Sequence, residues 1–175
     1  VSPHTSGYSK ASIIAHWISA IAVIVLFVTH EGENGDMANL IHVGGGALIG
    51  LFLLWRVWHR IRSGMTEAPD QALIFTVASK IVMWGFLAAI AVVTLTGYFL
   101  PWTKGADLDI FGVLSIPSPM AANYPVHEFV EEAHEIAGHA FPILLILHVL
   151  GAVKHLVIDR DGIVSRMMRP VSGGR

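Results

Sequence analysis

The segment from His134 to His155 reads HEIAGHAFPILLILHVLGAVKH and decides the fold of this chain. Apolar residues dominate from about Ile136 to Ile158, which is long enough for a helix to cross the hydrocarbon core of a bilayer. His134 and His148 are fourteen residues apart, which in an α-helix is close to four turns and about 21 Å of rise. The segment therefore predicts a membrane helix that carries two imidazoles on one face, at two different depths.

The remainder of the chain contains three more apolar stretches, at about Ala11–Thr29, Leu40–Val57 and Ile81–Leu100. Of the 175 residues, 54% are apolar and 14% are charged, whereas a soluble domain has about 25% charged residues. This composition excludes a soluble globular protein, a disordered chain and a coiled coil. We predict an all-α fold, a bundle of four transmembrane helices that forms a single membrane-embedded domain over residues 1–175.

Charge is distributed unevenly between the two sides of the predicted membrane. Ten of the eleven Lys and Arg residues lie in the N-terminal segment, in the 56–80 region or at the C-terminal end, and Lys104 is the exception. Nine of the thirteen acids lie on the side of Lys104, in the 30–39 loop, in the 101–128 loop or just after it. The positive-inside rule then predicts four spans with both termini in the cytoplasm. The net charge of −2 gives no basic field for nucleic acid.

Four histidines form two predicted pairs. In this topology His42 of the second span matches the depth of His134, and His16 of the first span matches the depth of His148. Two imidazoles on neighbouring helices suit the two axial positions of a b-type haem enclosed in a helix bundle. The pattern predicts two b-type haems, with His16, His42, His134 and His148 as the iron ligands.

Other readings of the histidines stay open. A zinc site needs three or four ligands at one depth, whereas this sequence offers two at each of two depths. A His-rich protein that binds or moves metal ions is the rival metal-binding class, and packing or interface histidines are the non-functional explanation. The chain has no Cys, which excludes disulfides, iron–sulfur clusters and covalently attached c-type haem.

Two arginines and a group of glycines lie near these pairs in the sequence. Arg56 is fourteen residues beyond His42, and Arg60 is one turn further. Both are candidates to bind haem propionates, or else are anchors of the positive-inside kind. The glycines that follow His42 either admit a flat macrocycle or allow close helix packing; they are Gly44, Gly45, Gly46 and Gly50.

Two further residues are candidates for substrate chemistry. His155 continues the face of His148 about 10 Å further along, where it is either an interface histidine or a hydrogen-bond partner for a quinone or a propionate. Lys104 is either a solvated lysine or a cation that attracts a small anion. The 101–128 loop predicts a short interfacial helix around Phe111. The remaining histidines are interpreted as loop, end or off-face residues: His4, His30, His59, His127 and His139.

The chain resembles the bacterial cytochrome b561 family over nearly its whole length. The motifs that carry the resemblance are Tyr8-Ser9-Lys10 with Ala15-His16-Trp17, Asn39-Leu40-Ile41-His42-Val43 followed by Arg56 and Arg60, Pro101-Trp102, Lys104-Gly105, Phe111-Gly112, His134-Glu135 with His148 and His155, Asp161-Gly162 and Arg166-Met167-Met168-Arg169-Pro170.

The resemblance implies a small four-helix di-haem cytochrome of the bacterial inner membrane, with axial ligands at His16, His42, His134 and His148. It also implies a ubiquinone site at the cytoplasmic end near His155. Stand-alone members resemble superoxide oxidases, which pass electrons from periplasmic superoxide through both haems to ubiquinone, and Lys104 matches the family's basic position. More distantly, the family resembles cytochrome b relay and anchor subunits of hydrogenases and other periplasmic dehydrogenases. The side that carries Lys104 also carries nine acids, which would repel an anionic substrate such as superoxide. Such an acidic side suits docking of a basic periplasmic redox protein.

Overall fold

The computed structural model describes residues 9–33, 35–64 and 71–168, so His4, Tyr8, Arg169 and Pro170 of the sequence analysis lie outside the described residues. Four membrane-length helical segments are present in this part of the chain. In order, the elements are α1 (Lys10–Val28), α2 (Met37–Leu40), the π-helical turn η1 (Ile41–Gly45), α3 (Gly46–Ser63), α4 (Leu73–Thr103), strands β1 (Leu108–Ile110) and β2 (Leu114–Ile116), α5 (Tyr124–Lys154), the π-helical turn η2 (His155–Asp159) and α6 (Ile163–Met168). The predicted helical bundle with four membrane spans is confirmed.

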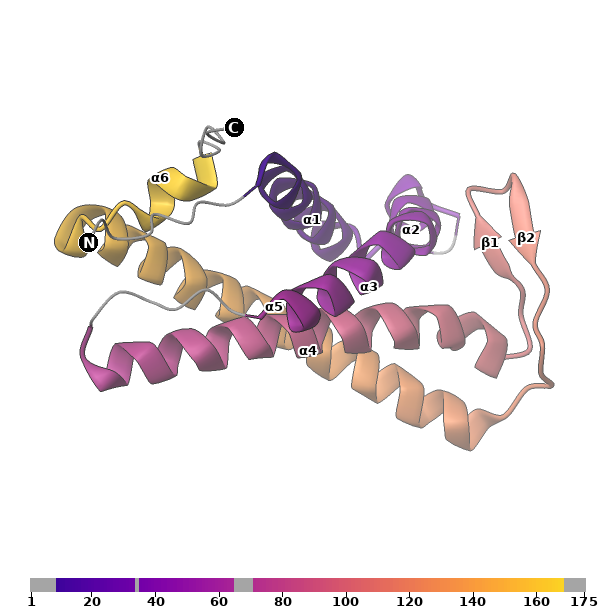
Figure 1. Cartoon of the computed structure of the whole chain (residues 1–175). Coiled ribbons are helices and arrows are strands. Elements are labelled where there is room, and N and C mark those ends of the chain that lie inside the picture. The colour runs from indigo at the N-terminus through magenta and orange to yellow at the C-terminus, as the bar shows by residue number, and fades with distance from the viewer. Residues whose placement is uncertain (1–8, 34, 65–70, 169–175) are drawn as a thin grey trace.

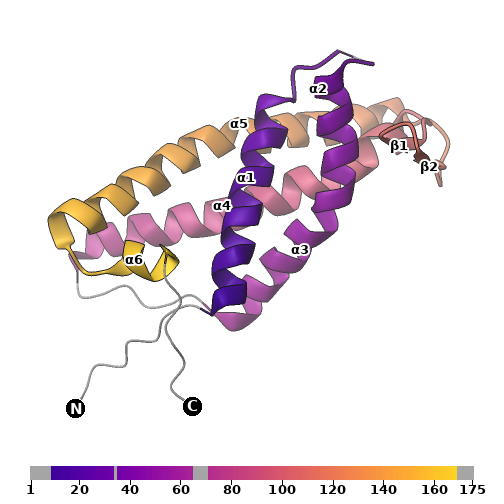
Figure 2. The same cartoon turned by 90° about the horizontal axis from the view of Figure 1, so that it is seen from above.

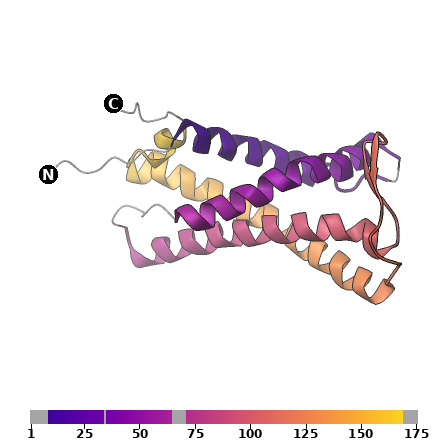
Figure 3. The ribbon, with the colours of Figure 1, turned by 45° about the vertical axis from the view of Figure 1, so that its right-hand side comes forward.

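The long helices run between two ends of the molecule that are easily told apart (Figures 1 and 3). We call the end that carries β1 and β2 the hairpin end, and the end that carries α6 the α6 end. Figure 2 shows α1 and α3 crossing over the pair formed by α4 and α5. The indole Nε1 of Trp17 donates a hydrogen bond to the Met167 carbonyl at 3.2 Å, and this bond attaches α6 to α1.

Polar caps fix where two of these helices begin. The Ser9 hydroxyl accepts the Ser12 N–H at 3.2 Å at the start of α1, and the Asn123 side chain accepts the Val126 N–H at 3.3 Å at the start of α5. Helices α4 and α5 both begin well before the apolar stretches that predicted them, at Leu73 and Tyr124 instead of about Ile81 and Ile136. The 101–128 loop is correspondingly shorter, since the structure ends α4 at Thr103.

The interior of the bundle is thin. Its buried apolar cluster consists of Leu53 and Val57 of α3 with Leu87 and Ile90 of α4. Helices α4 and α5 share the most extensive backbone contact among the described residues, whereas α1 makes far fewer such contacts, with η1 and α3. Many large apolar side chains face outward instead, as expected for surfaces covered by lipid.

One of the four clustered glycines marks a close helix approach. A Cβ at Gly50 would lie 2.7 Å from the Tyr98 hydroxyl oxygen and 2.9 Å from Thr94 Cγ2, so only glycine lets α3 and α4 approach this closely. The Tyr98 hydroxyl also donates to the Ala47 carbonyl at 2.7 Å. Of the two explanations for the glycines, close packing is the one seen at this position.

The predicted interfacial helix around Phe111 is wrong, because this segment is the turn of an antiparallel hairpin. Ile110 pairs with Leu114 across the turn, and Phe111 and Gly112 have φ values of 56° and 67°. The Asp109 carboxylate accepts the Gly112 N–H at 2.9 Å, which stabilises the left-handed turn. Phe111 packs against Gly44 of η1. A Cβ on Gly44 would lie 2.9 Å from the Phe111 backbone nitrogen.

Candidate functional site

At the hairpin end, His42 of η1 and His134 of α5 face each other with ring centres 6.1 Å apart and planes at 82°. The Nδ1 atom of His42 donates to the Leu26 carbonyl at 2.7 Å. The Thr96 hydroxyl donates to the Val92 carbonyl and therefore accepts from Nδ1 of His134 at 2.9 Å. With Nδ1 donating in both rings, both Nε2 atoms keep a free lone pair. This is the tautomer that a metal-ligating histidine needs.

At the opposite end of α5, His148 faces His16 of α1 with ring centres 6.2 Å apart and planes at 51°. Phe86 of α4 packs edge-on against His148 with ring centres 5.6 Å apart. The guanidinium of Arg56 lies 3.1 Å from Nδ1 of His16. Because guanidinium only donates, Nδ1 of His16 accepts and Nε2 carries the proton in this arrangement.

The spacing of both pairs fits a single metal ion between two imidazoles. A coordinating nitrogen lies about 2 Å from a transition metal and about 1 Å from its own ring centre, so two opposed ligands have centres about 6 Å apart. His16, His42 and His134 are half-buried, whereas His148 is exposed. Gly97 of α4 faces His134, and a Cβ there would lie 3.4 Å from the ring. Each pair of imidazoles is therefore spaced as the iron of a b-type haem requires of two histidine ligands.

The predicted auxiliary residues lie at the two ends as follows. Arg56 contacts His16, and Arg60 is half-buried one turn further along α3. Lys104 follows the last turn of α4 at the hairpin end, with its ammonium 3.9 Å from the Glu131 carboxylate and its side chain 55% exposed. The structure therefore brings Arg56 to the His16–His148 pair and places Lys104 in an ion pair.

His155 lies in η2 at the α6 end, in a cluster with two carboxylates. Its Nδ1 atom is 2.7 Å from Asp161 and 3.1 Å from Asp159. Burial alone would raise the pKa of the Asp161 carboxyl, but the Ile163 N–H, the His155 ring and the charge of Arg166 together hold that pKa below its usual range. Asp161 therefore remains ionised and orients the His155 ring.

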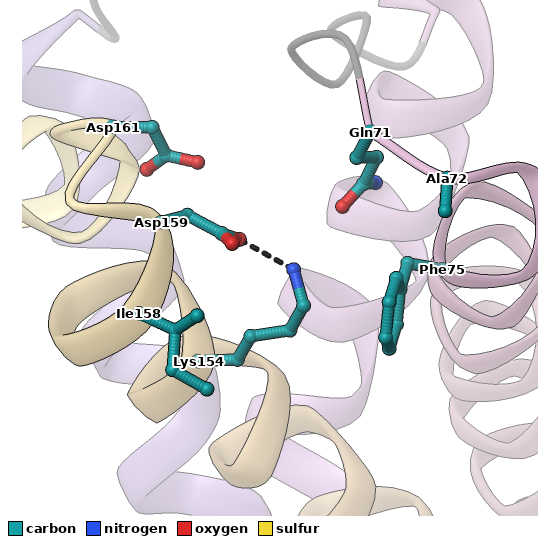
Figure 4. Close-up of a pocket in the computed structure, with 7 residues that line it drawn as sticks. All are labelled: Gln71, Ala72, Phe75, Lys154, Ile158, Asp159 and Asp161. Carbon is teal, nitrogen blue, oxygen red and sulfur yellow. Dashed lines mark hydrogen bonds and ion pairs between the residues drawn. The ribbon is translucent and has the colours of Figure 1, made fainter.

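A cavity of about 490 Å³ opens beside this cluster (Figure 4), and sequence reasoning missed it. Lys154 pairs with Asp159 inside it and lies 4.3 Å from the ring centre of Phe75. The amide oxygen and nitrogen of Gln71 are buried there, and the described residues give them no hydrogen-bond partner. The lining is Gln71, Ala72, Phe75, Lys154, Ile158, Asp159 and Asp161. No motif joins the start of α4 to the end of α5, so only the fold reveals the cavity.

Sequence reasoning also missed His127, which it placed among the loop and off-face histidines. The structure buries this residue to 5% exposure in the first turns of α5. Its Nδ1 atom is 2.8 Å from the Thr103 hydroxyl, and its Nε2 atom is 3.6 Å from the Glu131 carboxylate. The available signal was its spacing, because His127 precedes His134 by the same seven residues by which His155 follows His148.

Comparison with known proteins agrees with this arrangement. The sequence model of the family described as prokaryotic cytochrome b561 matches residues 7–170. Cytochrome b561 homolog 2 of Escherichia coli is 25% identical over 170 residues, which cover 92% of this chain and 90% of that protein. The probable superoxide oxidase CybB of Yersinia pestis is 20% identical over 168 residues, with 92% and 95% coverage.

A probable Ni/Fe-hydrogenase B-type cytochrome subunit of Bradyrhizobium diazoefficiens is 22% identical over 218 aligned positions, with 96% of this chain and 84% of that protein covered. The family match extends over nearly the whole chain, and the four apolar helices indicate a multi-pass membrane protein. This chain accordingly belongs to the prokaryotic cytochrome b561 family of bacterial membrane proteins, which bind b-type haem and transfer electrons.

Proposed function

We propose that this chain holds two b-type haems and carries electrons across the membrane from the hairpin end to the α6 end. His42 and His134 would hold one haem, and His16 and His148 the other. The observation that carries the proposal is the presence of two opposed imidazole pairs, with ring centres 6.1 and 6.2 Å apart, towards opposite ends of one helix. Bound haem supplies one-electron redox chemistry, which the side chains of this protein lack.

The protein's own residues would set what each haem site accepts. With these four histidines holding the iron, a substrate would have no free site at the metal and would react at the haem edge. Arg56 must leave Nδ1 of His16 before that ring can ligate through Nε2, since the ligating tautomer keeps its proton on Nδ1. We assign Arg56, together with Arg60, to the propionates of this haem, which offer the guanidinium groups carboxylates of opposite charge.

Ubiquinone is the acceptor that we propose at the α6 end. The cavity of about 490 Å³ is walled on one side by the Phe75 ring, and the unpartnered Gln71 amide is available to a quinone carbonyl. His155 stands beside the cavity and is held by Asp161 at 2.7 Å. A ubiquinone that receives two electrons also needs two protons, and His155 is placed to pass them from the cytoplasm.

Superoxide is the donor that we propose at the hairpin end. Two superoxide anions lose one electron each and become oxygen, while one ubiquinone gains these two electrons and two protons and becomes ubiquinol. Support comes from the relative in Yersinia pestis that is named a probable superoxide oxidase. Lys104 supplies a cation at this end, although Glu131 at 3.9 Å partly neutralises it.

A second function, that of an electron-relay and anchor subunit in a larger complex, is favoured by the surface of the hairpin end. Val113 is 90% exposed and Leu114 56% exposed on the hairpin, and Asp107 and Asp109 precede them in the sequence. Exposed apolar side chains next to acidic ones suit docking of a basic periplasmic redox protein. The relative named a hydrogenase cytochrome subunit supports this alternative.

A superoxide pulse distinguishes these functions. The oxidised protein in detergent is mixed with superoxide, with and without ubiquinone, while the visible spectrum is recorded. We expect a reduced-haem absorption band after the pulse, and we expect it to fade when ubiquinone is present. A haem protein that dithionite reduces and superoxide does not would support the relay function, and a colourless protein would refute both and favour the metal-ion class.

Lys104→Gln is the variant that sharpens this test. If superoxide is steered to the hairpin end, the variant reacts several-fold more slowly at low ionic strength, and the difference fades as salt is added. Lys80→Gln is the matched control, since Lys80 lies on α4 far from the hairpin end. Equal rates in the parent and Lys104→Gln would remove Lys104 from the donor site.

A further inference from the structure

We propose that His127 and Glu131 form a proton-binding site at the hairpin end that is coupled to the redox state of the haem held by His42 and His134. This inference rests on the proposed haem at that end. Neither residue is needed as a haem ligand or to conduct the electron. The site would take up one proton from the aqueous phase when this haem gains an electron, and would release it when the electron moves on.

The hydrogen bonds of His127 determine which of its nitrogens carries the proton. The Thr103 hydroxyl donates to the Leu100 carbonyl at 2.9 Å, so its oxygen is left to accept from Nδ1 of His127 at 2.8 Å. In the neutral ring, Nε2 is therefore a bare acceptor. Only 5% of the residue is exposed, and the described residues offer Nε2 no hydrogen-bond donor.

Nε2 instead faces a carboxylate. The Glu131 Oε1 atom lies 3.6 Å away, one helical turn further along α5. Two acceptors in this position repel each other, whereas a proton on Nε2 changes the contact into an ion pair between an imidazolium and a carboxylate. The contact between Nε2 of His127 and the Glu131 carboxylate is therefore favourable when Nε2 carries a proton and unfavourable when it does not.

The charges around this pair favour exchange of the proton with water. Thr103, which contacts the ring from α4, is neutral, and the ammonium of Lys104 lies 3.9 Å from Glu131. On α5, Glu128 and Glu132 are exposed. Glu131 itself is 46% exposed, so it connects the buried imidazole with solvent.

The position on α5 couples the site to the haem. His127 precedes His134 by two turns, about 10 Å of helix rise, on the same face. Because His127 is buried, a charge added at the haem is only partly screened over this distance. A proton on His127 therefore stabilises the reduced haem, and the midpoint potential of that haem should rise as the pH falls.

Redox titration of the loaded protein across about pH 5 to 8 tests the proposal. The haem at the hairpin end is assigned by repeating the titration in a His148→Ala background. We expect the parent potential to rise on acidification, and we expect this pH dependence to be lost in His127→Gln, whose amide can still donate to Thr103. Glu131→Gln should also flatten it, whereas the exposed neighbour Glu132→Gln should leave it unchanged.

A potential that is independent of pH in the parent, or a pH dependence that persists in His127→Gln, would overturn the proposal. If both variants lose haem, reduction-induced infrared difference spectra of the parent in H₂O and D₂O decide the question, because an imidazolium signal must accompany reduction. Failure of the proposed function is distinguishable, since it would leave the protein without a haem at His42 and His134 at all.

Discussion

The hairpin end and the α6 end repeat one arrangement with different outcomes. Each has an imidazole pair that joins α5 to another helix, and each has a further histidine seven residues nearer the surface beside a carboxylate. At the hairpin end the further histidine, His127, is buried against Thr103. At the α6 end it is His155, which stands beside a cavity. The same spacing thus yields a closed site at one end and a ligand-accessible site at the other.

Removing one ligand from each pair gives the largest expected effect. His148→Ala should lose the haem of the α6 end and abolish quinone reduction, while His134→Ala should lose the haem of the hairpin end and abolish reduction by superoxide. In both variants the haem content per protein should fall by half. His139→Ala, which removes an exposed histidine of the same helix, should keep both haems. Full haem content in His148→Ala would disprove the assignment.

Replacing the further histidine of the α6 end separates proton transfer from haem binding. His155→Ala should keep both haems and slow quinone reduction by about 100-fold, the size typical of a lost general acid. Stopped-flow oxidation of the pre-reduced protein by ubiquinone measures this rate. His59→Ala, an exposed histidine of α3, is the control. An unchanged rate in His155→Ala would mean that protons reach the quinone by another route.

A methyl group at Gly44 should destabilise the hairpin end selectively. Its Cβ would lie 2.9 Å from the Phe111 nitrogen, so the hairpin must move, at a cost of about 1–3 kcal/mol. Thermal unfolding and protease cleavage within residues 108–116 measure the effect. At Gly138 of α5 a Cβ would meet nothing within 4 Å, so Gly138→Ala should be neutral or slightly stabilising. Equal stability of the two variants would contradict the close contact.

The smallest effect concerns pH at the α6 end. Since the pKa of Asp161 is lowered from 3.8, its contacts stabilise the fold fully above that pH and are lost as the pH falls through the lowered value. Asp161→Asn should therefore cost about 1 kcal/mol near neutrality and progressively less in stronger acid. Unfolding of parent and variant at several pH values compares them. A difference that grows in acid would reverse the sign and refute the pairing with His155.

The sequence was sufficient for the elements that depend on local pattern. Four apolar stretches predicted the four spans, and the fourteen-residue spacing on α5 predicted which histidines would meet. The ring of His16 faces that of His148, and the ring of His42 faces that of His134. These pairs could be predicted because the position of a residue along a membrane helix follows directly from residue count.

Features that depend on contacts between distant segments were not predictable in this way. The hairpin needs Phe111 and Gly112 in the left-handed region, and composition alone does not distinguish that turn from a short helix. The burial of His127 depends on Thr103, which is 24 residues away on another helix. The cavity at the α6 end likewise combines residues from the beginning of α4 and the end of α5.

The π-helical turns have a consequence for how the length of these spans can change. Both η1 and η2 contain a histidine of interest, His42 and His155. A π turn holds one residue more than an α turn does, so deleting a single residue of η1 other than His42 would restore a regular helix and leave α3 facing nearly the same way. The same deletion within α3 would instead rotate everything beyond it by about 100°. The span can therefore shorten by one residue at 41–45 with Arg56 still directed at His16, whereas a deletion between Gly46 and Arg56 would turn Arg56 away from it.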